Sequence, residues 1–354
     1  MVSNSTSDTN GLKEKETPKA RDGFHAKGVP LGSILDITCP TLPVDVLLLD
    51  GKMEELNIYM EGVEGTVDTT TVEKSETKSP SVRDGTTVYD VQCPGFGCGT
   101  AGRIVAEIPP RYFGLRVKTS GNVTVQAGMK EAQLISVETM GNIHCQGSVS
   151  AEVIRLVSAG AGSVQASNIM AHICSIDTRS SDASGPVSVG RSSCLEMLVH
   201  AGTSTFQAES LLCSNAQVNA GTMTVKNLNT LDGKVHFGIA PSRDSSKVAV
   251  KGMDGQLRIA VLPTEKEQVP LHVDIQLNEN ARSLTVDADS RTCTTLNAAE
   301  SLDVLVESGD EVERYLAGGS RPTCKVVLPA QSTVRVNRRS WFEAFRQSNG
   351  FDGP

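Results

Sequence analysis

Six glycine-led units recur between residues 115 and 228: GNVTVQ (121–126), GNIHCQ (141–146), GSVQA (162–166), GPVSV (185–189), GTSTFQ (202–207) and GTMTVK (221–226). The steps from one glycine to the next are 20, 21, 23, 17 and 19 residues. A sustained period near 20 residues, built from short β-type segments, is typical of a solenoid. The drift in spacing around Gly185 predicts one or two coils with irregular loops.

Apolar residues alternate with polar ones inside these units, which predicts strands with one face turned inward. The inward pairs are Val123 and Val125, Ile143 and Cys145, Val187 and Val189, and Met223 and Val225. A second alternating pair precedes several of the glycines, so each coil should hold two or more short strands. We expect glycine at the turns because a left-handed backbone angle costs it little.

Stacking of the coils would bury these inward faces in one aliphatic column and pair each strand with its copies in neighbouring coils. Aromatic residues make up only 4% of the chain, which suits a narrow solenoid core. The sequence therefore predicts an all-β fold: an elongated, parallel, β-helix-like solenoid. A β-sandwich or barrel is the alternative, because short strands with regular turns also describe those folds.

The run IPPRYFGLRVKTSGNVTVQ (108–126) adds a family resemblance. Its order of prolines, alternating strand, Ser-Gly turn and second alternating strand resembles the opening of the adhesin-like β-solenoid domain family, whose function is unknown. The resemblance covers roughly residues 108–336. It implies a non-catalytic solenoid of a kind found in bacterial envelope-linked proteins and in intracellular eukaryotic ones.

Composition and hydrophobic patterning divide the chain into five expected parts. We expect a disordered tail over residues 1–27, N-terminal strands or a cap over 28–60, and an acidic polar loop over 61–90. The solenoid should occupy residues 91–336. An amphipathic helix and tail should follow over 337–354, with the helix as a C-terminal cap.

Charge and cysteine content limit the classes of function. A net charge of −8 and a pI near 5.4 argue against a nucleic-acid partner, which needs a basic surface. No run approaches 18 apolar residues, so no transmembrane segment is expected. The N-terminus lacks the apolar core of a secretory signal. The nine scattered cysteines predict mostly free, buried thiols and hence an intracellular protein, with a secreted or surface location less favoured.

The glycine-rich stretch VQCPGFGCGTAG (91–102) carries two cysteines. Cys93 and Cys98 have no second pair with which to bind a metal, and no Lys-Ser/Thr follows to complete a phosphate loop. We interpret the stretch as a turn that enters the solenoid. A redox-sensitive pair of Cys93 with Cys98 stays open as the alternative.

Two further groups invite a functional interpretation. His144, His172 and His200 are spaced 28 residues apart, which is not a whole number of coils, so surface histidines are favoured over a metal column. Between residues 115 and 228, Asp177, Arg179, Asp182 and Arg191 form the only local concentration of charges. An exposed ion-pair loop is favoured over a carboxylate pair for glycoside hydrolysis. We therefore predict no catalytic residue, no cofactor and no metal ligand.

Residues 338–346 (RRSWFEAFR) change character to an amphipathic helical pattern. Trp341, Phe342 and Phe345 would lie on one face of that helix. We expect this face to cover the open end of the coil stack, with docking of a partner as the alternative.

The most favoured function is a non-catalytic binding or scaffolding protein that uses the solenoid faces for an unknown protein partner. The alternatives are a carbohydrate-active β-helix enzyme and a cell-surface adhesin. The sequence does not indicate the oligomeric state.

Overall fold

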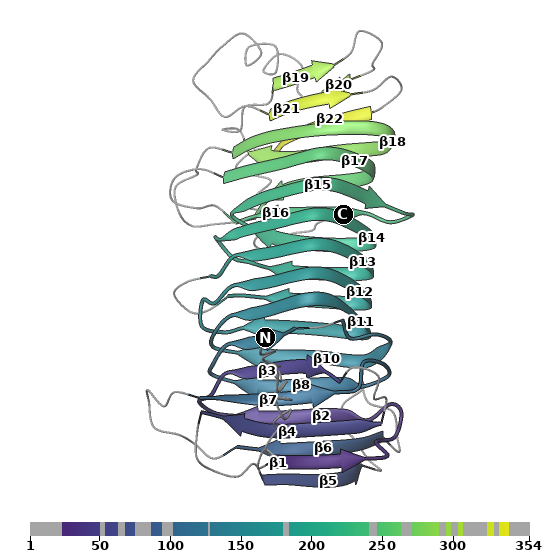
Figure 1. Ribbon diagram of the computed structural model, residues 1–354. Helices are drawn as coiled ribbons and strands as arrows, with labels where there is room; N and C mark the ends of the chain where they lie inside the picture. Colours follow the sequence, from purple (N-terminus) through teal and green to yellow (C-terminus); the bar gives the residue numbers. More distant parts are fainter. Residues whose placement is uncertain are drawn as a thin grey trace, which may run out of the picture.

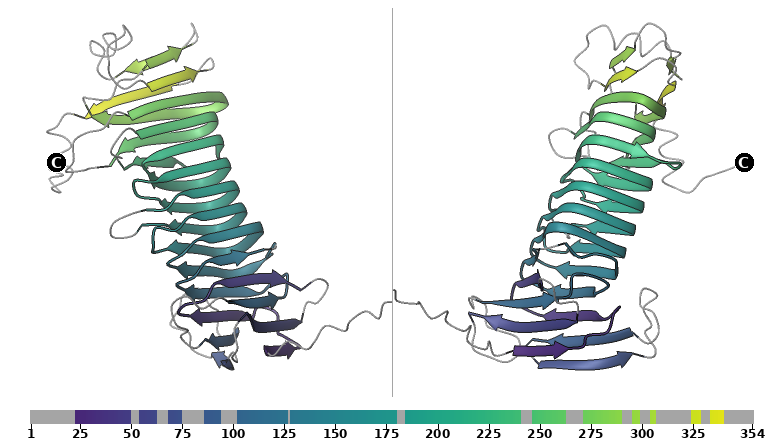
Figure 2. Two further views of the ribbon diagram at one scale, coloured as in Figure 1. Left: turned by 60° about the vertical axis from the view of Figure 1, so that its left-hand side comes forward. Right: turned by 45° about the vertical axis from the view of Figure 1, so that its right-hand side comes forward.

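The computed structural model describes residues 23–49, 54–62, 68–74, 86–93, 102–126, 128–179, 184–240, 246–262, 271–289, 295–298, 304–306, 324–328 and 333–339. Within these residues the protein is all-β and contains no helix. Its strands form an elongated parallel β-solenoid of about seven turns, shown in Figures 1 and 2. The predicted solenoid is thus confirmed, whereas the predicted C-terminal helix falls, from residue 340 on, outside the described ranges.

The main body of the solenoid follows the region of the sequence repeat. Its strands are β8 (Gly114–Thr119), β9 (Val123–Val125), β10 (Ala132–Thr139), β11 (Ile143–Ser158), β12 (Val164–Asp177), β13 (Val187–His200), β14 (Thr205–Ala220), β15 (Thr222–Thr230), β16 (Val235–Ile239) and β17 (Ser246–Val261).

Each coil has three straight segments, or arms, because the alternation of inward and outward residues along its long strand is interrupted twice. We call each interruption a slip. In β11 the inward side chains are those of Ile143 and Cys145, then Val149 and Ala151, then Ile154 and Leu156. The strand turns a corner at each slip, near Gly147 and near Glu152. We call residues 143–146 of β11, 148–151 and 153–158, with their copies in other coils, the first, second and third arms. The pairing of β12, β13 and β14 skips the same two corners.

Inward residues stack in register from coil to coil. Cys145 lies between Val125 and Ala166, and the same column runs on to Val189, Ala208 and Val225. The predicted equivalence of Cys145 with Val125 and Val225 is therefore confirmed. Each buried aliphatic side chain of such a column contributes about 1.5–3 kcal/mol.

The turns between coils are held by hydroxyl groups. The Thr139 hydroxyl donates a hydrogen bond to the carbonyl oxygen of Gly121 and accepts one from the Gly141 amide at 2.9 Å. Ser158 repeats the first contact one coil further on, with a 2.7 Å bond to the Gly141 carbonyl. These bonds satisfy turn groups that no strand reaches.

The reason for glycine at the turns differs from the predicted one. Gly141 and Gly162 do not have left-handed backbone angles. Instead, a Cβ atom on Gly162 would lie 2.1 Å from the carbonyl oxygen of Gly141, so close stacking of the turns excludes a side chain. Gly202 does have a φ of +53°. Its turn is two residues longer, because Phe206 rather than Ser204 pairs with Val187.

The N-terminal end contains more strands than predicted, and its coils do not stack in the order in which they occur in the sequence. Its strands are β1 (Gly23–Lys27), β2 (Ile34–Cys39), β3 (Val44–Leu48), β4 (Glu55–Glu61), β5 (Asp68–Lys74), β6 (Thr86–Gln92) and β7 (Arg103–Ile108). The coil made by β2 and β3 is inserted between the coil of β6 and β7 and that of β8 and β9. Strands β1, β4 and β5 pair antiparallel around this end (Figure 1).

Two predicted boundaries are therefore wrong. The segment 61–90, expected as one acidic loop, contains β5 and most of β6, and the expected tail 1–27 ends in strand β1. Long-range pairing makes strands of these polar segments. β5 pairs with β6, which carries Val88 and Val91, and β1 pairs with β4, which carries Leu56 and Ile58.

At the other end the remaining strands continue the stack. They are β18 (Leu271–Asp289), β19 (Thr295–Ala298), β20 (Val304–Val306), β21 (Cys324–Leu328) and β22 (Thr333–Arg339). Because β22 pairs with β18 as far as Arg339, residues 338 and 339 are strand, contrary to the predicted helix start. Trp341, Phe342 and Phe345 lie outside the described residues.

Candidate functional site: an axial groove

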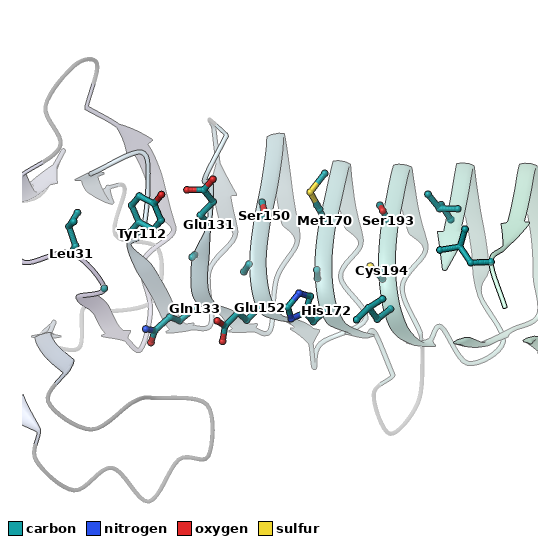
Figure 3. Close-up of a pocket in the computed structure, with 17 residues that line it drawn as sticks. Leu31, Tyr112, Glu131, Gln133, Ser150, Glu152, Met170, His172, Ser193 and Cys194 are labelled. Carbon is teal, nitrogen blue, oxygen red and sulfur yellow. The ribbon is translucent and has the colours of Figure 1, made fainter. Parts of the chain in front are cut away.

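A groove of about 710 Å³ runs along the solenoid axis, across the strands, from Leu31 before β2 to Leu231 after β15. It follows the corner between the second and third arms. Figure 3 shows its side chains in two rows, with Glu131, Ser150, Met170 and Ser193 in one and Gln133, Glu152 and His172 in the other.

The local sequence explains the groove. Small inward residues occupy the corner in successive coils: Ala132, Ala151, Ala171 and Cys194. The residues on either side of each one point outward, because side chains alternate along a strand. The two outward rows therefore form the walls of the groove, and the small inward residues form its floor.

Large apolar side chains are exposed along this groove. Leu31, Tyr112, Met170, Leu195 and Leu231 are 68%, 42%, 61%, 52% and 48% exposed. They are five of the eight large hydrophobic residues that are exposed in the described part of the chain. Exposed apolar side chains that gather in one place mark interaction sites, whereas scattered ones do not.

A second hollow of about 380 Å³ lies on the third arm of the same coils. It includes Ile173 and Leu198, which are 47% and 36% exposed. Met170 and Ile173 belong to one coil and Leu195 and Leu198 to the next, so the apolar surface continues around the corner. We call this four-residue surface the corner patch.

The charged residues that line the groove are acidic. Glu131 and Glu152 supply two carboxylates, and neither lysine nor arginine is among the lining residues. A hydrogen bond from the Tyr112 hydroxyl to the Glu131 carboxylate raises the pKa of Tyr112, and the nearby Arg111 guanidinium opposes this shift. Arg111 itself does not line the groove.

The groove offers no strand edge. Ala151 pairs with Ala132 on one side and with Ala171 on the other, and Cys194 pairs in the same way with Ala171 and Cys213. The backbone groups of these floor residues are thus engaged within the coil stack, whereas the pairing skips the corner residue beside each of them. A ligand can gain contacts from side chains here, but it cannot add a strand.

The three evenly spaced histidines lie on different surfaces. His144 is on the outward side of the first arm, His172 lines the groove, and His200 is on the third arm, where its Nδ1 lies 3.0 Å from the Asn219 amide nitrogen. Among the described residues, no cluster of three or more His, Cys, Asp or Glu could hold a metal ion.

The charged group around Asp177 is an ion pair beside a histidine. The Arg179 guanidinium donates to Asp177 at 2.7 and 3.0 Å. Burial opposes ionisation of Asp177, but the bonds from Arg179 outweigh it and lower the pKa of this carboxyl. His200 lies nearby, and partial burial together with the Arg179 charge lowers its pKa. Asp182 lies outside the described residues, and Arg191 is exposed on the second arm.

Six cysteines are described with their side chains and are free: Cys39, Cys93, Cys145, Cys174, Cys194 and Cys213. Burial raises the pKa of Cys145 to about 12, which makes its thiol unreactive. Cys98 lies outside the described residues, and the neighbour of Cys93 is Cys39 in the adjacent strand. Sequence spacing did not indicate this contact, because the two residues are 54 positions apart.

Sequence reasoning missed the groove itself. Its lining residues share no residue type, and their common property is a position beside a small inward residue at a corner. The repeated alanines at 132, 151 and 171 were the available signal.

Within the described part of the chain, no helix has the length and apolar character of a membrane span. Comparison of this chain with protein-family models, with curated proteins and with solved structures found no match.

Proposed function

We propose that this protein is a non-catalytic binding or scaffolding protein, and that the axial groove with the corner patch is its principal binding site for another protein. The observation that carries the proposal is the gathering of five exposed large apolar side chains along one groove. Water contact with such side chains is unfavourable, and a partner that covers them would gain about 25 cal/mol for each Å² buried.

The proposal extends to the location and the type of protein. Free, buried cysteines are typical of a reducing compartment, which supports an intracellular role. The adhesin-like family resemblance favours the same non-catalytic class of function. A cell-surface adhesin is an alternative, but free thiols are less typical of an extracellular protein.

A carbohydrate-active enzyme is the alternative from another class. Such enzymes need two carboxylates placed across a bound sugar, and sugars stack on exposed aromatic rings. In the groove, Tyr112 is the one aromatic residue, and leucine and methionine predominate among the exposed apolar side chains. Aliphatic side chains suit a protein surface better than a glycan.

Affinity purification from the native source, with mass spectrometry, tests the proposed function. The bait is the full chain, compared with a groove variant (Met170→Ser with Leu195→Ser) and with the matched control Met140→Ser. Met140 is 54% exposed but does not line the groove. We expect partners that bind the unchanged chain and the control and are lost from the groove variant. The same partners with all three baits, or release of reducing sugars from a glycan panel, would contradict the proposal.

A further inference from the structure

The backbone pairing of the groove restricts what can occupy it. The strands on its floor are paired on both sides, so the groove provides side-chain contacts but not a ladder of backbone partners. A chain bound there must satisfy its own backbone hydrogen bonds, since buried unpaired groups are costly. An α-helix does so internally, whereas an isolated extended strand does not.

The length of the groove fits a helix of ordinary size. From β2 the coils follow in the order β8, β10, β11, β12, β13, β14 and β16, which is seven steps. At ~4.8 Å per step the groove is about 34 Å long. A helix of about 22 residues has this length at 1.5 Å per residue.

The exposed apolar side chains favour an amphipathic helix as the bound element. Met170 and Leu195 stand one coil apart, and Ile173 and Leu198 widen the apolar surface around the corner. The strand spacing of ~4.8 Å is close to the 5.4 Å pitch of a helix, so successive turns can contact successive coils. A helix with apolar residues at every third and fourth position presents such a stripe.

The charged residues of the groove predict which side chains lie beside the apolar stripe of that helix. Glu131 and Glu152 are the carboxylates of one half of the groove, and neither lysine nor arginine lines it. Lysine or arginine beside them would be attracted, whereas a second set of carboxylates would be repelled. Electrostatic complementarity of this kind sets the orientation and specificity of a complex.

We propose that the groove binds an amphipathic α-helix of a partner protein, with its apolar stripe on Met170 and Leu195 and with lysine or arginine residues beside Glu131 and Glu152. This inference rests on the proposed binding function and specifies the partner.

Selection from a displayed library of random 22-residue peptides on the immobilised full-length protein tests this. We expect the enriched peptides to be helical, with an apolar stripe and net positive charge. Their affinity, measured by fluorescence anisotropy, should fall about 10- to 100-fold with Leu195→Ser, because burial of one leucine is lost. It should fall about 3- to 10-fold with the double variant Glu131→Gln and Glu152→Gln, with a weaker dependence on salt. The control Met140→Ser should bind as the unchanged chain does.

The outcomes separate the two proposals. Enriched peptides that are extended, proline-rich or acidic, or that ignore Leu195→Ser, overturn the helix inference and leave the binding function standing. Absence of enrichment overturns the helix inference as well. If the native-source purification also yields no groove-dependent partner, the proposed function fails with it.

Discussion

At the scale of single residues, the stacked turns require glycine because of proximity. A Cβ atom at position 162 would meet the Gly141 carbonyl oxygen at 2.1 Å, and a Cβ atom at position 185 would meet the Gly162 carbonyl oxygen at 1.9 Å. Both contacts are with backbone, which cannot rotate away. The spacing of two adjacent coils would have to increase to admit a methyl group.

We therefore expect Gly162→Ala to lower the free energy of unfolding by about 1–3 kcal/mol, the usual cost of overpacking. Urea unfolding followed by circular dichroism measures the change. Gln165→Ala is the matched control, since Gln165 points outward from the next strand and is exposed. An unchanged midpoint for Gly162→Ala would show that the turns are looser than this stacking requires.

The ion pair of Asp177 with Arg179 predicts a weak dependence of stability on pH. Burial alone would raise the pKa of Asp177, but the Arg179 hydrogen bonds lower it below 3.8. The resulting stabilisation is present above the unfolded-state pKa and is lost as pH falls through the folded-state value. We expect Asp177→Asn to cost less than about 1 kcal/mol at neutral pH, because both partners are partly exposed.

Urea titrations at several pH values test this expectation for Asp177→Asn. The difference from the unchanged chain should shrink as the pH falls below 3.8. Glu196→Gln removes a carboxylate from an exposed position of the next coil and serves as the control. A difference that grows in acid would contradict the assigned sign.

At the scale of elements, one hydroxyl group bridges two successive turns between coils. Thr139 is 1% exposed and links Gly121 of the preceding turn with the Gly141 amide. Thr139→Val keeps the shape and leaves both backbone groups without this partner. We expect it to cost about 1–3 kcal/mol in the free energy of unfolding.

Thr139→Ser is the matched test of the same turn. Serine keeps the hydroxyl and occurs naturally at the equivalent position 158. Its cost should be close to that of one buried methyl group, about 0.8 kcal/mol. Equal losses for the valine and serine variants would show that packing of the methyl group, rather than the hydrogen bonds, stabilises the turn.

The elements also show where sequence reasoning ends. Alternation predicted the first and third arms, because Ile143 with Cys145 and Ile154 with Leu156 each keep a period of two. It did not reveal the corners, where the inward step from Ala151 to Ile154 breaks that period. The groove lies at such a corner. The insertion of β2 and β3 between later coils was equally hidden, because pairing between distant segments leaves no local periodicity.

At the scale of the whole molecule, the stack has two different ends. Antiparallel strands β1, β4 and β5 surround the N-terminal end (Figure 1). At the other end, β19 pairs only with β21 and β20 only with β22 among the described strands. An uncovered strand edge invites association with another chain. Repeat proteins manage such ends with terminal caps.

The aromatic residues that follow β22 predict how the second end is protected. Trp341, Phe342 and Phe345 follow Arg339 by two, three and six residues. At these distances along the chain they can cover the last coils. Burial of three large rings contributes about 2–3 kcal/mol each. Truncation after Arg339 should therefore lower the melting temperature and cause concentration-dependent aggregation, measured by calorimetry and light scattering. Truncation after Arg346 keeps the three rings and should behave as the full chain does. If the shorter protein instead stays monomeric and equally stable but loses a partner in the pull-down, the rings dock that partner and the end of the stack needs no such cover.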